Sequence, residues 1–159
     1  MKSENALVFL YTAQNKYSYN ALAGALETDA FFEAVEIYFP DNEKTLVEKL
    51  PDIVKKHNMV VLAISFMTPQ LWKIASLVRK LRGQYGKHIT LIAGGSHPSG
   101  DVGETLRMGF DVVARGEGEA LIVDLLKQLY TDGTLQDVPG IAFVQDNGIC
   151  RLSRVCGRK

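Results

Sequence analysis

The sequence predicts an α/β fold with three layers, in which a parallel five-stranded sheet has helices on both faces. Short apolar runs alternate five times with amphipathic helical stretches along the 159 residues. One run, Met59 to Ser65, is apolar on both of its faces, which is typical of a central strand covered from two sides. Strands separated by helices require right-handed crossovers, and such connections make the sheet parallel.

The first strand is expected at Ala6 to Tyr11, before a polar loop from Thr12 to Tyr17 and a helix through Leu22 to Leu26. In the second strand, Val35 to Phe39, apolar and polar residues alternate. This alternation predicts an edge strand with one face more exposed to solvent than the other. Pro40 ends the strand because proline has no N–H to donate to a ladder.

The second and third helices have recognisable start signals. Asp41 or Asn42 can cap the second helix, in which Pro51 predicts a kink or a restart. After the central strand, Thr68 and Pro69 have the pattern of an N-cap and first position of a long helix. The polar face of that long helix carries the basic residues Lys73, Arg79, Lys80 and Arg82.

The fourth strand, Thr90 to Ala93, leads into a loop from Gly94 to Gly100 and then a short helix to about Met108. The fifth strand is expected at Asp111 to Ala114, before a helix carrying Ile122 to Leu129. For five such units in series, the flavodoxin-like strand order 2-1-3-4-5 is expected.

The C-terminal part of the sequence predicts a β-hairpin. Ile141 to Gln145 and Ile149 to Leu152 flank Asn147-Gly148, a strong two-residue turn signal. The hairpin lies outside the five-unit core, so residues 1–135 are expected to form one domain. Residues 136–159 are expected to form a hairpin and linker that lead toward a further part of the protein.

Composition limits the classes of partner. The chain has 18 basic and 18 acidic residues and a pI near 6.8, so neither nucleic acid nor an acidic membrane is an expected partner. The longest nearly apolar run, Met59 to Met67, is far shorter than the about 20 residues that a membrane-spanning helix needs. A signal-peptide pattern is absent, which predicts a cytoplasmic, reducing setting. Cys150 and Cys156 are expected to be reduced thiols or, alternatively, an accidental disulfide of the tail.

Ligands of open parallel sheets bind beyond the carboxyl ends of the strands, where the strand order reverses. A dinucleotide site is excluded because Thr12 to Tyr17 contains no glycine, and a phospho-accepting receiver is excluded because Ser65 replaces the required aspartate. An FMN site stays open as an alternative, although only Thr12 and Ser18 supply hydroxyl groups for a phosphate loop.

The pair Gly94-Gly95 admits two interpretations. It can let a flat or nucleotide-like ligand lie on the backbone, or it can serve a tight turn with positive φ. His97 is the only histidine of the candidate site, and no second metal ligand is near it in sequence. Glu117 and Glu119 are either an acid/base pair or partners of a helix dipole.

Three runs of residues, taken in order, resemble a known family. They are Ser65-Phe66-Met67-Thr68-Pro69, Gly94-Gly95-Ser96-His97-Pro98-Ser99, and the stretch from Gly109 that ends in Arg115-Gly116-Glu117-Gly118-Glu119. Together they resemble the N-terminal cobalamin (vitamin B12) binding domain of cobalamin-dependent radical S-adenosylmethionine (SAM) enzymes, often labelled Fe-S oxidoreductases. The similarity covers about Ala6 to Leu152.

The resemblance implies a Rossmann-like module that holds cobalamin base-off, with the nucleotide tail of the cofactor beside the sheet. The Gly94-Gly95 edge would line the slot for that tail. No residue of this chain is expected to be catalytic or to bind a metal. The residues expected to contact the cofactor are Thr12, Gln14, Asn15, Tyr17, Ser65, Phe66, Thr68, Gly94, Gly95, Ser96, His97, Arg115, Gly116 and Glu117.

Two departures from related proteins shape the expected function. The CxxxCxxC motif that holds a 4Fe-4S cluster in whole enzymes is absent, so the cluster and SAM would belong to a radical SAM domain elsewhere in the protein or in trans. The DxHxxG motif, whose histidine ligates cobalt from below in other cobalamin domains, is also absent. The lower face of cobalt would therefore face Gln14, Asn15, Tyr17 or Tyr19, or water. The alternatives are a ligand-free interaction domain of the same fold and a flavin-binding module.

Overall fold

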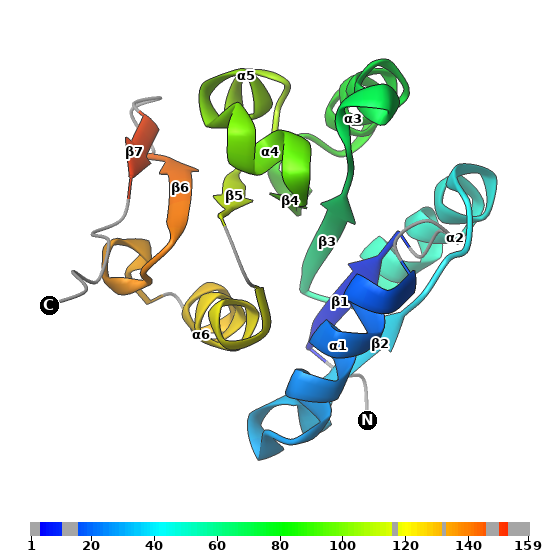
Figure 1. Ribbon diagram of the computed structural model, residues 1–159. Helices are drawn as coiled ribbons and strands as arrows, with labels where there is room; N and C mark the ends of the chain where they lie inside the picture. The colour runs from blue at the N-terminus through cyan, green and yellow to red at the C-terminus, as the bar shows by residue number, and fades with distance from the viewer. Residues whose placement is uncertain (1–3, 11–15, 116–117, 132, 146–149, 153–159) are drawn as a thin grey trace, which may run out of the picture.

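The computed structural model describes residues 4–10, 16–115, 118–131, 133–145 and 150–152. Among them, seven strands form one sheet in the order β2-β1-β3-β4-β5-β6-β7 (Figure 1). The strands are β1 (Asn5–Phe9), β2 (Val35–Tyr38), β3 (Met59–Ser65), β4 (Ile89–Gly94), β5 (Val112–Ala114), β6 (Ile141–Val144) and β7 (Cys150–Leu152).

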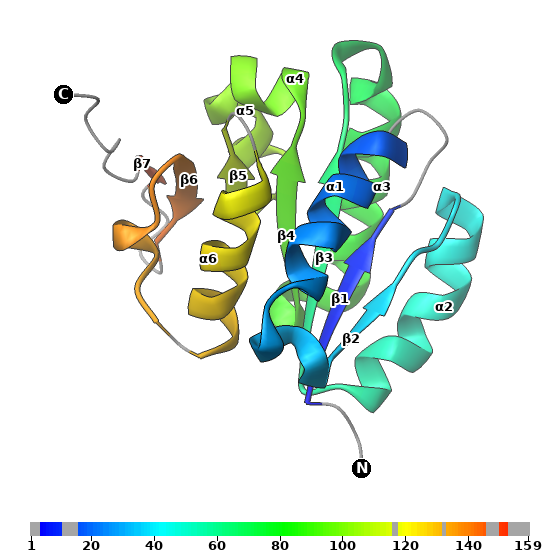
Figure 2. The same cartoon turned by 60° about the horizontal axis from the view of Figure 1, so that its bottom comes forward.

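Helices cover both faces of the sheet, as Figures 1 and 2 show. The α-helices are α1 (Lys16–Glu27), α2 (Glu43–Lys56), α3 (Leu71–Tyr85), α4 (Ser96–Gly100), α5 (Val102–Arg107) and α6 (Gly118–Tyr130). The 3-10 helices are η2 (Ala30–Ala34), η3 (Thr68–Gln70), η4 (Gly86–His88) and η5 (Leu135–Asp137). Helices α1 and α6 lie on one face, and α2, α3, α4 and α5 lie on the other.

The topology confirms the predicted α/β fold. Strands β1 to β5 are parallel and follow the order 2-1-3-4-5. The C-terminal hairpin extends the same sheet, because β6 pairs antiparallel with β5 and β7 pairs antiparallel with β6. The seven strands therefore form a mostly parallel sheet with an antiparallel edge.

Alternating side chains of the strands fill two separate cores. In β3, Val60, Leu62 and Ile64 join the core beneath α2 and α3. Val61 and Ala63 point to the opposite core beneath α1 and α6. All five side chains are buried, which confirms that this strand is covered on both faces.

Three local predictions need correction. Helix α2 follows its N-cap Asn42 and continues through Pro51, so of the kink or restart expected there the restart does not occur. Thr68 does not cap the long helix, because the short helix η3 precedes α3 and has Met67 at its N-cap. The expected loop after β4 is helical from Ser96 onward, since the positive φ of Gly95 turns the chain and the Ser99 N–H donates to the Gly95 carbonyl.

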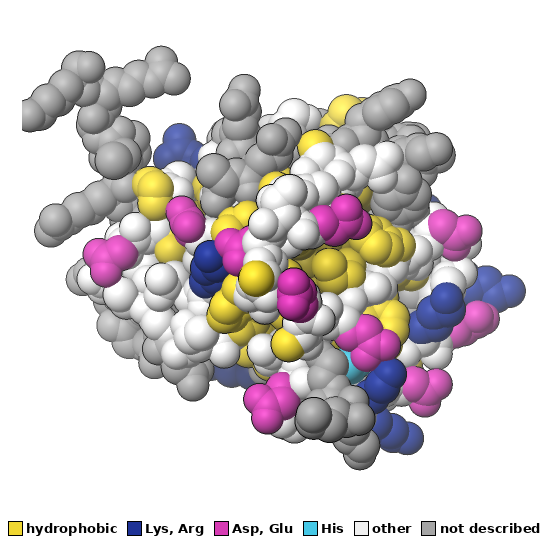
Figure 3. All heavy atoms as spheres, turned by 90° about the horizontal axis from the view of Figure 1, so that it is seen from below, with side chains coloured by type: hydrophobic (Ala, Val, Ile, Leu, Met, Phe, Trp, Pro, Cys, Tyr) yellow, Lys and Arg dark blue, Asp and Glu magenta, His cyan; other side chains and the backbone are white. Residues whose placement is uncertain are grey.

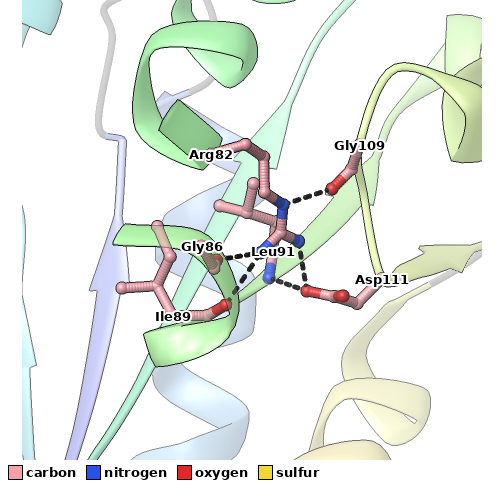
Figure 4. Close-up of polar contacts among 6 residues, drawn as sticks. All are labelled: Arg82, Gly86, Ile89, Leu91, Gly109 and Asp111. Carbon is pink, nitrogen blue, oxygen red and sulfur yellow. Dashed lines mark hydrogen bonds and ion pairs between the residues drawn. The ribbon is translucent and has the colours of Figure 1, made fainter. Parts of the chain in front are cut away.

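Arg82 ties three segments together at the amino-terminal end of β4 (Figure 4). Its guanidinium donates to the carbonyls of Gly109, Gly86 and Ile89 at 2.7, 2.7 and 3.0 Å. It also pairs with the Asp111 carboxylate, which accepts the Leu91 N–H at 2.8 Å. Arg82 is thus partly buried against these segments, although its place in the sequence predicted a polar outer face.

Helix α1 has no charged residue between Lys16 and Glu27. In the view of Figure 3, hydrophobic side chains gather near the centre, with both acidic and basic side chains around them. In the part of the chain that the structure describes, no helix has the length and apolar character needed to cross a bilayer.

Candidate functional site

The strand order reverses between β1 and β3, so a ligand site is expected at the carboxyl ends of these strands and of β4. These ends lie at the upper edge in Figure 2. Several predicted site residues lie outside the described residues: Thr12, Gln14, Asn15, Gly116, Glu117 and the side chain of Tyr17. The described part of the site consists of the loop after β3, the turn after β4 and the end of β5.

The ends of β3 and β4 are joined through their backbones. Ser65 is the register partner of Gly94, and the Phe66 N–H donates to the Gly94 carbonyl at 3.1 Å. From α1, the Tyr19 hydroxyl accepts the Ser65 N–H at 2.7 Å. Burial raises the pKa of the Tyr19 hydroxyl far above its ordinary value, so this group stays neutral. Tyr19 therefore holds the end of β3 in place through a buried hydrogen bond.

The two glycines after β4 have different roles. Gly95 has a φ of 102°, and a Cβ atom there would lie 2.7 Å from the Phe66 carbonyl oxygen and 2.9 Å from Ser65 Oγ. It therefore serves the tight turn. At Gly94 a Cβ atom would meet no other atom within 4 Å, so this glycine leaves an open space at the end of the strand. The turn interpretation thus holds for Gly95, whereas the ligand interpretation stays a prediction for Gly94.

His97 connects α4 to the loop after β3. Its Nδ1 lies 3.1 Å from Thr68 Oγ1, and its ring stacks on Phe66 with a centroid distance of 5.5 Å. Its Nε2 is buried without a hydrogen bond, and Glu104 Oε2 from α5 lies 3.7 Å away. Because one ring nitrogen is engaged and the other is buried, neither is available to a metal or substrate in this arrangement.

The structure brings together the six predicted residues Ser65, Phe66, Thr68, Gly94, Gly95 and His97. Ser96 is exposed at the start of α4. Arg115 is exposed beyond the end of β5, and its N–H donates to the Gly140 carbonyl at 2.8 Å.

Two contributors to this site were missed by sequence reasoning. Phe110 stacks on Phe66 with a centroid distance of 6.0 Å, and Glu104 approaches His97. Phe110 lies in the third run that carries the family resemblance but was not predicted to belong to the site, and Glu104 lies outside the three runs. The hydrophobic pattern around Phe110 predicts burial, but it gives no indication of which ring Phe110 contacts.

Beyond this site, two features of the described residues concern metal ions and cavities. No three His, Cys, Asp or Glu side chains of the described residues are grouped to hold a metal ion. A cavity of about 270 Å³ opens near the amino ends of β4 and β5, away from the predicted site. Its lining residues are Lys87, Ile89, Thr90, Asp111, Val112, Leu129, Leu135, Val144 and Gln145.

Comparison with known proteins identifies the family. Residues 15–126 match the family model of the B12 binding domain, which therefore accounts for most of the chain. The chain belongs to the B12-binding domain family. None of the curated proteins compared with the sequence matches it.

Solved structures share the fold of this B12-binding domain at low sequence identity. The radical SAM methyltransferase TsrM from Kitasatospora setae, with cobalamin and a 4Fe-4S cluster bound, has a TM-score of 0.72 at 15% identity. The cobalamin-dependent radical SAM enzyme OxsB with aqua-cobalamin bound has a TM-score of 0.66 at 18% identity. Each match covers 96% of this chain but only 29% of TsrM and 22% of OxsB. The B12-binding domain thus spans less than a third of the length of these enzymes.

Proposed function

We propose that this chain binds cobalamin in base-off form at the carboxyl edge of its sheet and serves a radical SAM enzyme as the cofactor-binding module. The open space at Gly94 is the observation that carries the proposal. A glycine at the end of a buried strand, with no atom where a side chain would stand, leaves room for a ligand to approach the backbone. Membership of the B12-binding family supplies the class of ligand.

The described residues fit a large ligand with polar groups. Thr68 and Ser96 are exposed hydroxyl residues on the two loops beside Gly94, and Ser65 is half-buried between them. We place the nucleotide tail beside Gly94. Arg115 and the undescribed residues Thr12, Gln14, Asn15, Tyr17, Gly116 and Glu117 complete the proposed set. When bound, cobalamin supplies radical and group-carrier chemistry, whereas the protein supplies binding and orientation.

The cofactor is proposed to lack a histidine ligand on its lower face. The two ring nitrogens of His97 are occupied or buried, as described above. Electron paramagnetic resonance of the Co(II) form is therefore expected to show no nitrogen splitting from an axial base. Splitting that disappears in His97→Gln would identify His97 as the ligand and contradict this part of the proposal.

The proposed partner is a radical SAM domain, either in the same protein or in trans. The B12-binding domains of TsrM and OxsB are parts of much longer enzymes. Here Trp72 at the start of α3 is 82% exposed, and Met67 in the preceding loop is 44% exposed. Large apolar side chains at this edge suit a protein contact. We further propose that residues 136–159 lead toward such a domain and that the setting is cytoplasmic, where thiolate ligands of a cluster stay reduced.

Absorbance after mixing with hydroxocobalamin and desalting tests the proposal. The wild-type chain is expected to retain a corrin band. Gly94→Val is expected to weaken binding by more than about tenfold, because the branched side chain fills the space proposed for the tail. Gly83→Val is the matched control, because Gly83 also has open space around it but lies on α3, away from this edge.

Two outcomes would contradict the proposal. Loss of the corrin band from the wild-type chain would favour the ligand-free interaction domain, and retention of FMN instead would favour the flavin module. Equal binding by Gly94→Val and the Gly83→Val control would show that the open space is not the ligand site.

A further inference from the structure

The contacts of His97 connect three segments that are distant in sequence. Thr68 and Phe66 come from the loop after β3, His97 comes from α4, and Glu104 comes from α5. The His97 side chain is only 9% exposed, and its ring continues a stack through Phe66 to Phe110. An exposed hydroxyl, that of Thr68, is thus fixed by a buried imidazole.

The same segments border the open space at Gly94. The Phe66 N–H is bonded to the Gly94 carbonyl, and the Gly95 Cα faces the Phe66 carbonyl so closely that no side chain fits between them. The loop after β3 and the turn after β4 therefore have little freedom to move apart. The hydrogen bond between His97 and Thr68 is a further link between these two segments, on the side where Thr68 faces solvent.

We propose that His97 is a positioning residue that makes the site selective for the nucleotide tail of cobalamin, acting through Thr68. This inference rests on the proposed function. Gly94 is half-buried at the end of its strand, and the proposed function places the nucleotide tail beside it. A contact that fixes the loop after β3 against the turn after β4 is therefore expected to affect the binding of the tail more than the binding of the corrin ring.

Cobinamide provides the matched ligand, because it keeps the corrin ring of cobalamin and lacks the nucleotide tail. Two substitutions of His97 provide the matched variants. Asparagine places a polar atom where Nδ1 of His97 stands, whereas glutamine places one near the position of Nε2. Both remove the ring that stacks on Phe66, so the difference between them reports the contact with Thr68.

Affinities for hydroxocobalamin and cobinamide are measured by titration calorimetry on the wild-type chain and the variants. His97→Gln and Thr68→Val are expected to weaken cobalamin binding by about tenfold, the effect of losing one hydrogen bond that orders the loop beside the ligand. Their affinity for cobinamide is expected to change by less than about twofold. His97→Asn and Thr68→Ser, which keep a polar partner, are expected to retain cobalamin affinity within about threefold.

The outcomes separate this inference from the proposed function. A wild-type chain that binds neither ligand contradicts the proposed function and the inference with it. A wild-type chain that binds both ligands, with variants that lose both equally, shows that His97 only supports the fold and contradicts the inference alone. Unchanged cobalamin affinity in Thr68→Val also contradicts it. Thermal unfolding of each variant without ligand identifies any loss due to unfolding, and Thr68→Val and Thr68→Ser differ only at one exposed residue.

Discussion

Gly95 tolerates no side chain, whereas its neighbour Gly94 does. Alanine at position 95 must adopt a φ of 102° and approach the Phe66 carbonyl to 2.7 Å. We expect Gly95→Ala to lower the free energy of unfolding by about 2–4 kcal/mol, from backbone strain and the close contact together. Gly94→Ala is expected to change it by less than about 1 kcal/mol.

Urea denaturation of the two variants measures the difference. Equal stability of Gly95→Ala and Gly94→Ala would show that the turn after β4 adapts to a side chain. Because Gly95→Ala acts on the fold itself, any loss of cobalamin by that variant gives no information on the ligand site. The substitution that reports on the ligand is the one at Gly94.

At the scale of single elements, Arg82 is the residue that fixes the start of β4 relative to α3 and β5. Its guanidinium donates to three backbone carbonyls and pairs with Asp111, and its side chain is 21% exposed. Arg82→Met leaves these carbonyls and the carboxylate without their partner. We expect a loss of about 2–4 kcal/mol in the free energy of unfolding.

Arg82→Lys is expected to recover less than half of that loss, because one ammonium group cannot replace a planar fork with several donors. Arg79→Met is the control, since Arg79 is an exposed residue of the same helix and its replacement should cost less than about 0.5 kcal/mol. Chemical denaturation checks the series. A loss in Arg82→Met no larger than in Arg79→Met would contradict the role assigned to Arg82.

Helix α6 and the 3-10 helix η2 are joined by a pH-sensitive ion pair. Lys127 Nζ lies 2.6 Å from Asp29 Oδ2, and this hydrogen bond, with the Phe31 N–H, holds the pKa of Asp29 below its ordinary value. A lowered pKa in the folded state stabilises the fold above the unfolded value of about 3.9, and the contribution is lost as the pH falls through the folded pKa.

Asp29→Asn is therefore expected to be less stable than the wild type at neutral pH and equally stable once the pH is well below the pKa of Asp29 in the folded state. Thermal unfolding between neutral and acid pH measures this convergence. Glu33→Gln, which alters an exposed carboxylate of the adjacent 3-10 helix η2, is the control for removing one negative charge from this region. A stability difference for Asp29→Asn that is constant with pH would contradict the assignment.

At the scale of the whole molecule, the sequence predicts the layers and the strand order because these depend on periodicity. Apolar runs such as Met59 to Ser65 mark the buried strands directly. The details of the site depend on backbone angles and on contacts between distant loops. A Gly-Gly pair does not reveal which glycine has positive φ, and nothing in the sequence pairs Thr68 with His97, 29 positions away. Arg82 was misplaced for a related reason, since a long side chain on a polar helix face can still turn inward.

The hairpin is predicted to be part of the stable unit rather than an appendage. Strand β5 pairs with β4 at two positions and with β6 at three. A chain cut after residue 135 leaves β5 as a short edge with unpaired backbone groups. We expect that shortened chain to self-associate and to unfold at lower temperature than the full chain, measured by light scattering and calorimetry. A monomer of unchanged stability would show that the five parallel strands suffice.

The position of β5 between an earlier and a later strand also has a consequence for synthesis on the ribosome. Residues 112–114 leave the ribosome before their partner β6, residues 141–144, has emerged. During that interval, the growing chain presents an open strand edge to its surroundings. Such edges promote misassembly and aggregation of nascent chains. The antiparallel pairing with β6 closes this edge, so a segment translated later protects a strand made earlier.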